Sequence, residues 1–267
     1  MMNGRVLIIA GSDSGGCAGI QADIKTVTML DAFAMTAVTA LTAQNTEGVF
    51  GVLPIAPDFI RRQIEVVLDD IGADALKTGM LHDTAVIETV AVVIAERAGA
   101  VPLVVDPVMV AKGGAPLIEA GAIDALKRLL IPRAAVLTPN LPEAEILAGH
   151  AIGDLAAMHS TAEELLGLGC AAVLLKGGHL PGGTVYDVLA TATGLRVWES
   201  PRIDSRHTHG TGCTLASAIA AGLAQGMAIE PAVERARAYV QLAIASAPGL
   251  GHGHGPLDHA HPLHSQP

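Results

Sequence analysis

Short apolar runs rich in β-branched residues alternate along the chain with longer segments in which apolar residues recur every three or four positions. The short runs predict strands and the longer segments predict helices. The predicted strands are Arg5–Ala10, Met35–Leu41, Ala75–Thr78, Leu103–Asp106, Ala135–Thr138 and Ala172–Lys176, with a hairpin-like region at Thr184–Trp198. The predicted helices are Ile20–Leu30, Pro57–Asp70, Thr84–Arg97, Ala115–Leu130, Pro142–Leu147, Thr161–Gly167, Cys213–Gln225 and Pro231–Ala245.

This alternation predicts the α/β class. Repeated strand–helix units are typical of a mostly parallel central sheet with helices on both faces, which is a three-layer sandwich. No Ser- or Pro-rich linker, charge block or repeat divides the 267 residues. One domain over residues 1–267 is therefore the simplest interpretation.

Composition supports this class and excludes others. Apolar residues make up 51% of the chain and aromatic residues 2%, so the core must be built from Ala, Val, Leu and Ile. That apolar fraction excludes a disordered chain. A formal charge of −10 with few aromatic residues argues against a nucleic-acid partner, which needs a basic groove and stacking surfaces.

The hydropathy of the chain and the spacing of its cysteines indicate the cellular compartment in which the protein is expected to lie. The mean hydropathy of +0.47 raises the question of membrane spans. The two long uncharged stretches, His207–Ile229 and Ala238–Leu257, are interrupted by Gly, His, Gln or Pro, so we expect no membrane partner. Three widely spaced cysteines indicate reduced thiols and a cytoplasmic location.

Polar and glycine-rich residues follow four of the predicted strands. They are residues 11–16, 78–80, 106–108 and 176–179, and a fifth such segment, 209–213, precedes a predicted helix. In an open parallel sheet, ligands bind outside the carboxyl ends of the strands. These five segments are therefore the predicted position of a binding site.

The segment Gly210-Thr211-Gly212-Cys213 predicts an anion-binding turn. Its glycines allow close backbone approach, and the following helix directs free N–H groups and the positive end of its dipole toward the turn. The same field would lower the pKa of Cys213 and make it available as a base or nucleophile. The alternative is a small-residue turn with a buried structural cysteine.

Other strand ends carry candidate phosphate or metal ligands. Lys176 precedes two glycines and suits a phosphate, although a strand-end lysine is also a common surface charge. Asp106 suits Mg²⁺ or a reacting group, or else a turn cap. Asn140 and Glu143 form either a second oxygen-rich cluster or the capping box of the following helix.

Neither common nucleotide-binding motif is present. The chain has no G-x-x-x-x-G-K-[ST] segment, which disfavours a P-loop NTPase. Its first glycine-rich loop lacks G-x-G-x-x-G spacing, which disfavours a flavodoxin-like or dinucleotide-binding module. Phosphate handling by strand-end residues is the interpretation that remains.

Six segments carry a family resemblance. They are AGSDSGGCAGIQAD (10–23), VTALTAQNT (38–46), VVDPVMV (104–110), TPNLPEAE (138–145), KGGH (176–179) and THGTGC (208–213). In this order they resemble the hydroxymethylpyrimidine/phosphomethylpyrimidine kinases of thiamine biosynthesis, members of the ribokinase-like superfamily. The resemblance runs from about residue 5 to about His259 and implies a single ribokinase-like kinase domain.

The resemblance implies a substrate and its pocket. The enzyme would use ATP and Mg²⁺ to phosphorylate 4-amino-5-hydroxymethyl-2-methylpyrimidine and then its monophosphate, giving the diphosphate. Gln44 would hydrogen-bond the aminopyrimidine, which suits a carboxamide that offers one donor and one acceptor. The pyrimidine pocket would also be lined by Gly11, Asp23, Met80 and Val108.

The resemblance also implies catalytic and nucleotide-binding residues. The anion hole would be formed by Gly210, Thr211 and Gly212, and Cys213 would stand where related sugar kinases have an aspartate base. The residues implied at the nucleotide and its metal are Lys176, which neutralises phosphate, Asp106 and Glu143 at Mg²⁺, and Asn140 and Thr208 beside the nucleotide. Homodimers are usual in this family, although no segment identifies an interface.

Two segments depart from the family pattern. Cys17 stands in the first loop, where the family commonly has glycine. Residues 251–267 are richer in histidine than the family's glycine-rich ending. We expect this segment to be a mobile, solvated tail rather than a metal site.

Two rival functions stay open at this point. A pyridoxal or pyridoxine kinase shares the superfamily, but Gln44 and its flanking residues favour an aminopyrimidine. A non-catalytic pyrimidine sensor would keep the pocket without turnover. The presence of Asp106, Glu143, Lys176 and Cys213 argues against a sensor, which would not need all four.

Overall fold

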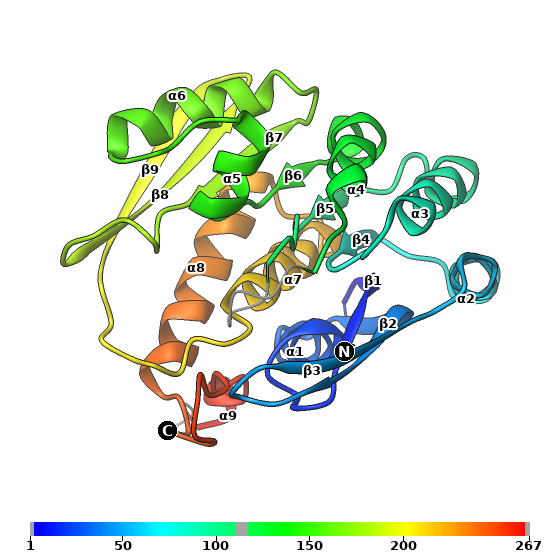
Figure 1. Ribbon diagram of the computed structural model, residues 1–267, viewed down its shortest axis with the longest axis horizontal. Helices are drawn as coiled ribbons and strands as arrows, with labels where there is room; N and C mark the ends of the chain where they lie inside the picture. The colour runs from blue at the N-terminus through cyan, green and yellow to red at the C-terminus, as the bar shows by residue number, and fades with distance from the viewer. Residues whose placement is uncertain (1–2, 111–116, 265–267) are drawn as a thin grey trace.

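A nine-stranded sheet crosses the computed structural model, which describes residues 3–110 and 117–264 (Figure 1). The strand order is β3-β2-β1-β4-β5-β6-β7-β8-β9. The strands are β1 Arg5–Asp13, β2 Phe33–Gln44, β3 Val49–Pro54, β4 Ala75–Thr78, β5 Leu103–Val105, β6 Val136–Leu137, β7 Ala172–Lys176, β8 Thr184–Thr191 and β9 Gly194–Pro201. The six central strands β2-β1-β4-β5-β6-β7 pair in parallel, and β3, β8 and β9 extend the two edges by antiparallel pairing.

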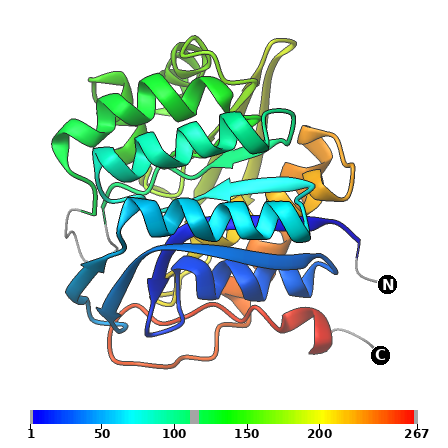
Figure 2. The same cartoon turned by 90° about the vertical axis from the view of Figure 1, so that its right-hand side faces the viewer.

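Helices cover both faces of this sheet (Figures 1 and 2). One face carries α1 Gly19–Met29, α7 Thr211–Ala224 and α8 Ile229–Ala245. The other carries α2 Pro57–Asp70, α3 Thr84–Arg97, α4 Ala120–Ala125, α5 Leu141–Ala148 and α6 Leu155–Leu166. The expected three-layer α/β sandwich is confirmed. No helix in the described part of the chain is long and apolar enough to span a membrane.

The central strands are continuous apolar runs because helices bury both of their faces. In β1, Leu7 and Ile9 belong to the apolar cluster under α2 and α3, whereas Val6 and Ile8 belong to the cluster under α1 and α7. All four side chains are fully buried. Four predicted elements, namely the strands β4 and β7 and the helices α2 and α3, have the bounds expected from this periodicity.

The edge strand β3 was not predicted. Most of its side chains are exposed, so no inside–outside alternation marks it in the sequence. The asparagine in the turn before β3 is a sequence feature that indicates a hairpin. In the structure Asn45 Oδ1 accepts hydrogen bonds from the backbone N–H groups of Glu47 and Gly48 at 2.8 and 3.2 Å. Such an Asx turn between two apolar runs is typical of a hairpin, and here it joins β2 to β3.

Helices α1, α5, α7 and α8 differ from their predicted bounds by one or two residues at an end, and two helices differ by more. Helix α6 begins at Leu155 rather than Thr161, because the side chain of Asp154 accepts from Ala157 N at 2.8 Å and caps the earlier turn. The predicted helix Ala115–Leu130 falls partly outside the described residues. Within them α4 begins at Ala120, is followed by a π-helical segment Leu126–Leu130, and leads to a 3₁₀ turn Ile131–Arg133.

A buried ion pair joins the sheet to α1. Nζ of Lys77 on β4 lies 3.0 and 2.9 Å from the two carboxylate oxygens of Asp23, and both side chains are fully buried. Ser217 on α7 donates to Asp23 Oδ1 at 2.7 Å. Burial by itself would lower the pKa of Lys77, but the nearby carboxylates, Asp23 first, raise it above its ordinary value. The Lys77 ammonium therefore stays charged inside the protein.

We expect Lys77→Met to destabilise the protein by about 3–5 kcal/mol, because it leaves Asp23 buried without its counter-charge. Urea unfolding at neutral pH measures the loss. The control, Arg97→Met, removes an exposed ion pair with Asp69 and should cost far less. Equal losses in the two variants would contradict this account.

Candidate active site

A cavity of about 720 Å³ lies where the carboxyl ends of the parallel strands meet the start of α7. The sequence-predicted residues that line it are Gly11, Gln44, Met80, Asp106, Val108, Asn140, Glu143, Lys176, Thr208, Gly210, Thr211, Gly212 and Cys213. Asp23 is not among its lining residues. It lies behind the wall in its ion pair with Lys77, and Lys77, which was not predicted, lines the cavity in its place.

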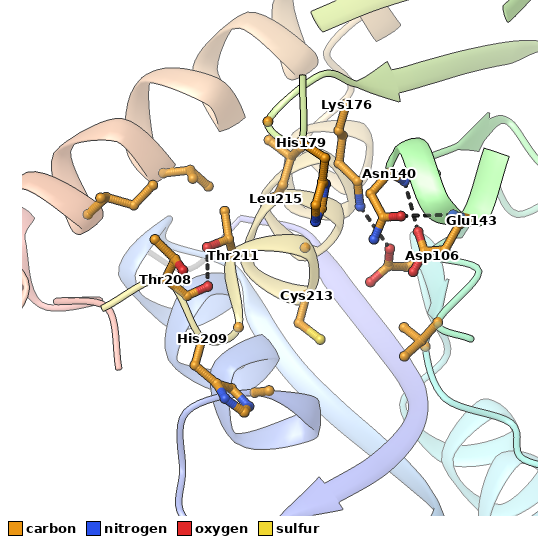
Figure 3. A pocket seen from close by; sticks show the side chains of 18 of the residues that line it. Asp106, Asn140, Glu143, Lys176, His179, Thr208, His209, Thr211, Cys213 and Leu215 are labelled. Carbon is orange, nitrogen blue, oxygen red and sulfur yellow. Dashed lines mark hydrogen bonds and ion pairs between the residues drawn. The ribbon is translucent and has the colours of Figure 1, made fainter. Parts of the chain in front are cut away.

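The turn before α7 requires glycine for two reasons. Gly210 has a φ of +83°, and a Cβ at this position would lie 1.9 Å from the carbonyl oxygen of Cys17. Thr211 Oγ1 donates to the carbonyl oxygen of Thr208 at 2.6 Å, which closes the turn (Figure 3). Residues 210–213 line the cavity, so the free N–H groups of this first helical turn can receive an anion there.

Cys213 lies in this first turn and is partly accessible. Removal of the thiol from water raises its pKa to about 12, and the attraction of Lys77 offsets only part of this effect. The pKa lowering expected from the helix dipole is thus wrong for this site, because lost hydration outweighs the field of the helix. At neutral pH the side chain is a thiol.

Asp106 directly follows β5, Lys176 ends β7, and the two side chains meet across the end of the intervening strand β6 (Figure 3). Lys176 Nζ lies 3.4 Å from Asp106 Oδ1, and Thr138 Oγ1 donates to the same oxygen at 3.3 Å. Asp106 Oδ2 is buried and has no hydrogen-bond partner among the described residues. Burial would lower the pKa of Lys176, but Asp106 and Glu143 raise it. A charged ammonium thus lies beside a carboxylate oxygen that can still take a ligand.

Asn140 and Glu143 form the capping box of α5, which confirms the structural alternative for this pair. Asn140 Oδ1 accepts from Glu143 N at 2.9 Å, and Glu143 Oε2 accepts from Asn140 N at 2.8 Å. Burial raises the pKa of Glu143 to about 7, against the attraction of Lys176. The capping box and the cavity wall therefore share the same two side chains, and one Glu143 oxygen is committed to the backbone.

The other end of the cavity is built by the loop after β1 and the end of β2. Asp13 organises this loop, since its carboxylate accepts from the N–H groups of Gly15, Cys17 and Ala18 at 2.8 to 3.0 Å. Ser14 joins the loop to Gln44 by two hydrogen bonds of 2.8 Å, one to the carbonyl oxygen and one from the N–H of Gln44. Gln44 is thus fixed at its backbone before any ligand binds.

The C-terminal segment 251–264 packs against this end of the cavity, which corrects the expectation of a solvated tail; residues 265–267 of that tail lie outside the described residues. The N–H groups of Gly253 and His254 donate to the side-chain and backbone oxygens of Thr46 at 3.3 and 2.8 Å. A Cβ at position 253 would lie 2.1 Å from the Thr46 carbonyl oxygen. The glycines of this segment therefore permit close contact with the β2–β3 turn.

Two histidines of this segment are buried structural residues. His259 Nε2 lies 3.0 Å from Thr214 Oγ1, and burial lowers the pKa of His259 to about 4. The His261 ring contacts Tyr239 with 4.7 Å between ring centroids. In residues 3–110 and 117–264, no group of three or more His, Cys, Asp or Glu side chains could hold a metal ion.

Comparison with known proteins identifies the family. Residues 13–258 match the family model described as phosphomethylpyrimidine kinase. This chain belongs to the phosphomethylpyrimidine kinase family. The chain is also 51% identical over 256 residues to the thiamine biosynthesis bifunctional protein of Geobacter sulfurreducens, covering 96% of this chain and 52% of that protein. It therefore spans about half the length of that relative.

Two further relatives of this kinase come from Bacillus subtilis. Its hydroxymethylpyrimidine/phosphomethylpyrimidine kinase is 48% identical over 256 residues, which cover 96% of this chain and 94% of that protein. Its pyridoxal kinase, solved as an ADP complex, has a TM-score of 0.91 at 38% identity and covers 99% of this chain and all of that one. The ribokinase-like fold is confirmed, and a pyridoxal kinase shares it.

We expect alkylation of Cys213 in this kinase by iodoacetamide to be slow at pH 8 and to rise about tenfold per pH unit up to pH 10, because a pKa near 12 leaves little thiolate. Peptide mapping by mass spectrometry follows Cys213 separately from Cys17 and Cys170. The same cysteine in urea-unfolded protein is the control and should react fastest and level off near its ordinary pKa of about 8.5. A plateau at or below pH 8 in the folded protein would contradict the structure.

Proposed function

We propose that this kinase transfers the γ-phosphoryl group of ATP to the hydroxyl of 4-amino-5-hydroxymethyl-2-methylpyrimidine, and then a second group to the phosphate of the product. The observation that carries the proposal is that one cavity holds Gln44, Cys213 and Lys176 together. Cys213 lies between His209, a neighbour of Gln44, and the Asp106–Lys176 pair in the view of Figure 3. A recognition group, an anion hole and a cation are thus arranged as a phosphoryl transfer requires.

Lys176, Thr208 and the first turn of α7 would bind the phosphates of ATP. The binding of ADP by the related pyridoxal kinase supports a nucleotide in this cavity. The donor set also fits Mg²⁺, because Asp106 Oδ2 lacks a partner among the described residues and Mg²⁺ is usually held by one or two carboxylates together with phosphates and waters. Asp106 and Glu143 would hold the ion, which when bound neutralises charge on the transferred phosphoryl group.

Gly210, Thr211, Gly212 and Cys213 would hold the transferred group through backbone N–H groups directed at its developing charge. Cys213 would receive the proton of the substrate hydroxyl. Its high pKa means that a thiolate able to accept a proton is scarce at neutral pH, so Lys77 and Lys176 must favour the charged form during transfer. Positioning and charge neutralisation therefore carry more of the rate than the base does.

Pyridoxal phosphorylation is the second candidate function. The pyridoxal kinase of B. subtilis aligns in space with 99% of this chain, so the architecture does not separate the two substrates. Gln44 does separate them, because a carboxamide matches the amino group and adjacent ring nitrogen of an aminopyrimidine. We therefore expect pyridoxal to be a weaker substrate than the aminopyrimidine alcohol.

ADP release with Mg·ATP tests this function. The alcohol, its monophosphate and pyridoxal are compared at matched concentrations. The proposal expects turnover of both pyrimidines, with pyridoxal well behind. Preference for pyridoxal would overturn the role of Gln44, and binding of the pyrimidine without ADP release would favour the sensor.

We expect Cys213→Ala to slow the first phosphorylation by about a hundredfold, near the lower end of the range for loss of a general base. The second step should lose less than tenfold, because a phosphate acceptor has little proton to give up. Separate single-turnover measurements with alcohol and monophosphate check this difference. Lys176→Met is the comparison variant and should slow both steps alike.

The homodimer usual in the family is also proposed for this chain. Side chains of the β2–β3 hairpin are unusually apolar for a surface: Phe50 is 71% and Leu53 62% exposed, and Leu41 and Val52 are exposed beside them. An exposed apolar edge strand is a surface that soluble proteins normally cover. A second copy of this hairpin is the partner that symmetry favours.

Sedimentation velocity at micromolar concentration should show a dimer for the unaltered chain. The double variant Phe50→Glu with Leu53→Glu should sediment as a monomer, because charge would be buried at the contact. Val92→Glu on α3, also at an exposed apolar position, is the control and should remain dimeric. A monomeric unaltered chain would overturn this assignment.

A further inference from the structure

His209 lies at the end of the cavity that holds Gln44, and no role for it was predicted from the sequence. His209 is only 7% exposed, and its backbone N–H donates to the carbonyl oxygen of Gly255 at 3.2 Å. Its ring points away from the Asp106–Lys176 pair (Figure 3). Nε2 of this ring lies 3.0 Å from the amide nitrogen position of Gln44 and 3.7 Å from Asp13 Oδ2.

The amide of Gln44 is held at both ends. His209 contacts one end, and the other end, the oxygen position, lies 3.2 Å from Thr42 Oγ1. The nitrogen and oxygen ends of a side-chain amide have the same shape, so their hydrogen-bond partners decide which is which. The orientation of Gln44 therefore depends on the protons of Thr42 and His209.

Thr42 has one hydroxyl proton and two neighbours that could accept it. Its Oγ1 lies 2.9 Å from the carbonyl oxygen of Ser12, which is closer than the 3.2 Å to Gln44. A carbonyl oxygen can only accept, so the proton of Thr42 belongs on the Ser12 side. A lone pair of the Thr42 hydroxyl then faces Gln44, so the end of the amide next to Thr42 must be the nitrogen, which can donate an N–H to it.

The contacts at the other end of the Gln44 amide, beside His209, independently favour the same orientation of the amide. The carboxylate of Asp13 faces Nε2 of His209 at 3.7 Å, and a lone pair on Nε2 would repel that negative charge. A proton on Nε2 is attracted by the carboxylate and can be donated to a carbonyl oxygen of Gln44. Both ends therefore favour an amide whose oxygen faces His209 and whose nitrogen faces Thr42.

We propose that His209 is a positioning residue that sets substrate specificity, because its Nε2–H holds the carbonyl oxygen of Gln44 and so fixes the order of donor and acceptor offered to the substrate. This inference rests on the proposed function. The amide keeps one N–H on the Thr42 side and one oxygen lone pair on the His209 side for the ligand. An aminopyrimidine then binds with its amino group toward His209 and its ring nitrogen toward Thr42. A ring with the reverse order is rejected, since buried polar groups would be left unpaired.

Steady-state kinetics of His209→Leu and His209→Gln test this role. We expect His209→Leu to raise the KM for the aminopyrimidine alcohol by about 10- to 100-fold, the effect of one lost buried hydrogen bond of about 1–3 kcal/mol. Its kcat and its KM for ATP should stay within about threefold, since Lys176 and α7 are unchanged. His209→Gln retains an N–H donor and should recover most of the affinity.

Three results would overturn the proposal: an unchanged KM in His209→Leu, parallel loss of kcat and ATP affinity, or a His209→Gln variant as weak as the leucine variant. The control is His254→Leu, which removes a nearby ring that contacts the carbonyl oxygen of Arg206 and lies outside the cavity lining. It should leave both KM values unchanged. Circular dichroism and thermal melting confirm that each variant is folded.

A second measurement does not depend on turnover. In ¹⁵N-histidine-labelled protein, long-range ¹H–¹⁵N spectra show which ring nitrogen carries the proton, and the resonance missing from His209→Leu identifies His209. The proposal expects a protonated Nε2 that shifts in Gln44→Leu. A proton on Nδ1 alone, or no response to Gln44→Leu, would overturn it. If the pyrimidine is not phosphorylated but Nε2 is protonated, the proposed function fails while the His209–Gln44 contact stands.

Discussion

The contact between Gly210 and the carbonyl oxygen of Cys17 sets the geometry of the cavity. Because a Cβ at position 210 would lie 1.9 Å from that oxygen, the turn before α7 can lie directly on the loop after β1 only with glycine there. This approach places the first turn of α7 beside Asp13 and Gln44 on one side and beside Lys176 on the other. A backbone contact between segments far apart in the sequence thus joins the two halves of the site.

Charge is placed locally in a protein whose formal charge is −10. Among the described residues two lysines line the cavity, and each is held charged by carboxylates, Lys77 by Asp23 and Lys176 by Asp106. The same burial that strengthens these pairs withdraws Cys213 from water and raises its pKa. The cavity therefore favours bound phosphate over a free thiolate, and the global charge has little influence on either.

The substrate end of the cavity is supported from three directions. The loop after β1 holds the backbone of Gln44 through Ser14, and the C-terminal segment holds both Thr46 and the backbone of His209. Glycines in that segment are needed because Thr46 leaves no room for a side chain at 253. His259 and His261 belong to the segment that the sequence predicts to be a solvated tail, but in the fold they are part of the packing around α7 and α8.

The sequence by itself determined the α/β class, the four elements with matching bounds, and a set of site residues all of which, except Asp23, line the cavity. It could do so because strands buried on both faces must be apolar runs, and because polar residues directly after such strands necessarily meet at one edge of a parallel sheet. The Asn140–Glu143 capping box was equally local, since both hydrogen bonds join residues three apart.

Only the tertiary structure decided the rest. The place of Asp23 depends on Lys77 on another strand, the pKa of Cys213 on burial by several elements, and the role of His209 on Gln44, 165 positions away. β3 was missed because an exposed strand has no burial pattern, and the C-terminal segment because its order comes from contacts with the β2–β3 turn. Periodicity reports which face of an element is buried, whereas desolvation and hydrogen-bond partners are properties of the packed chain.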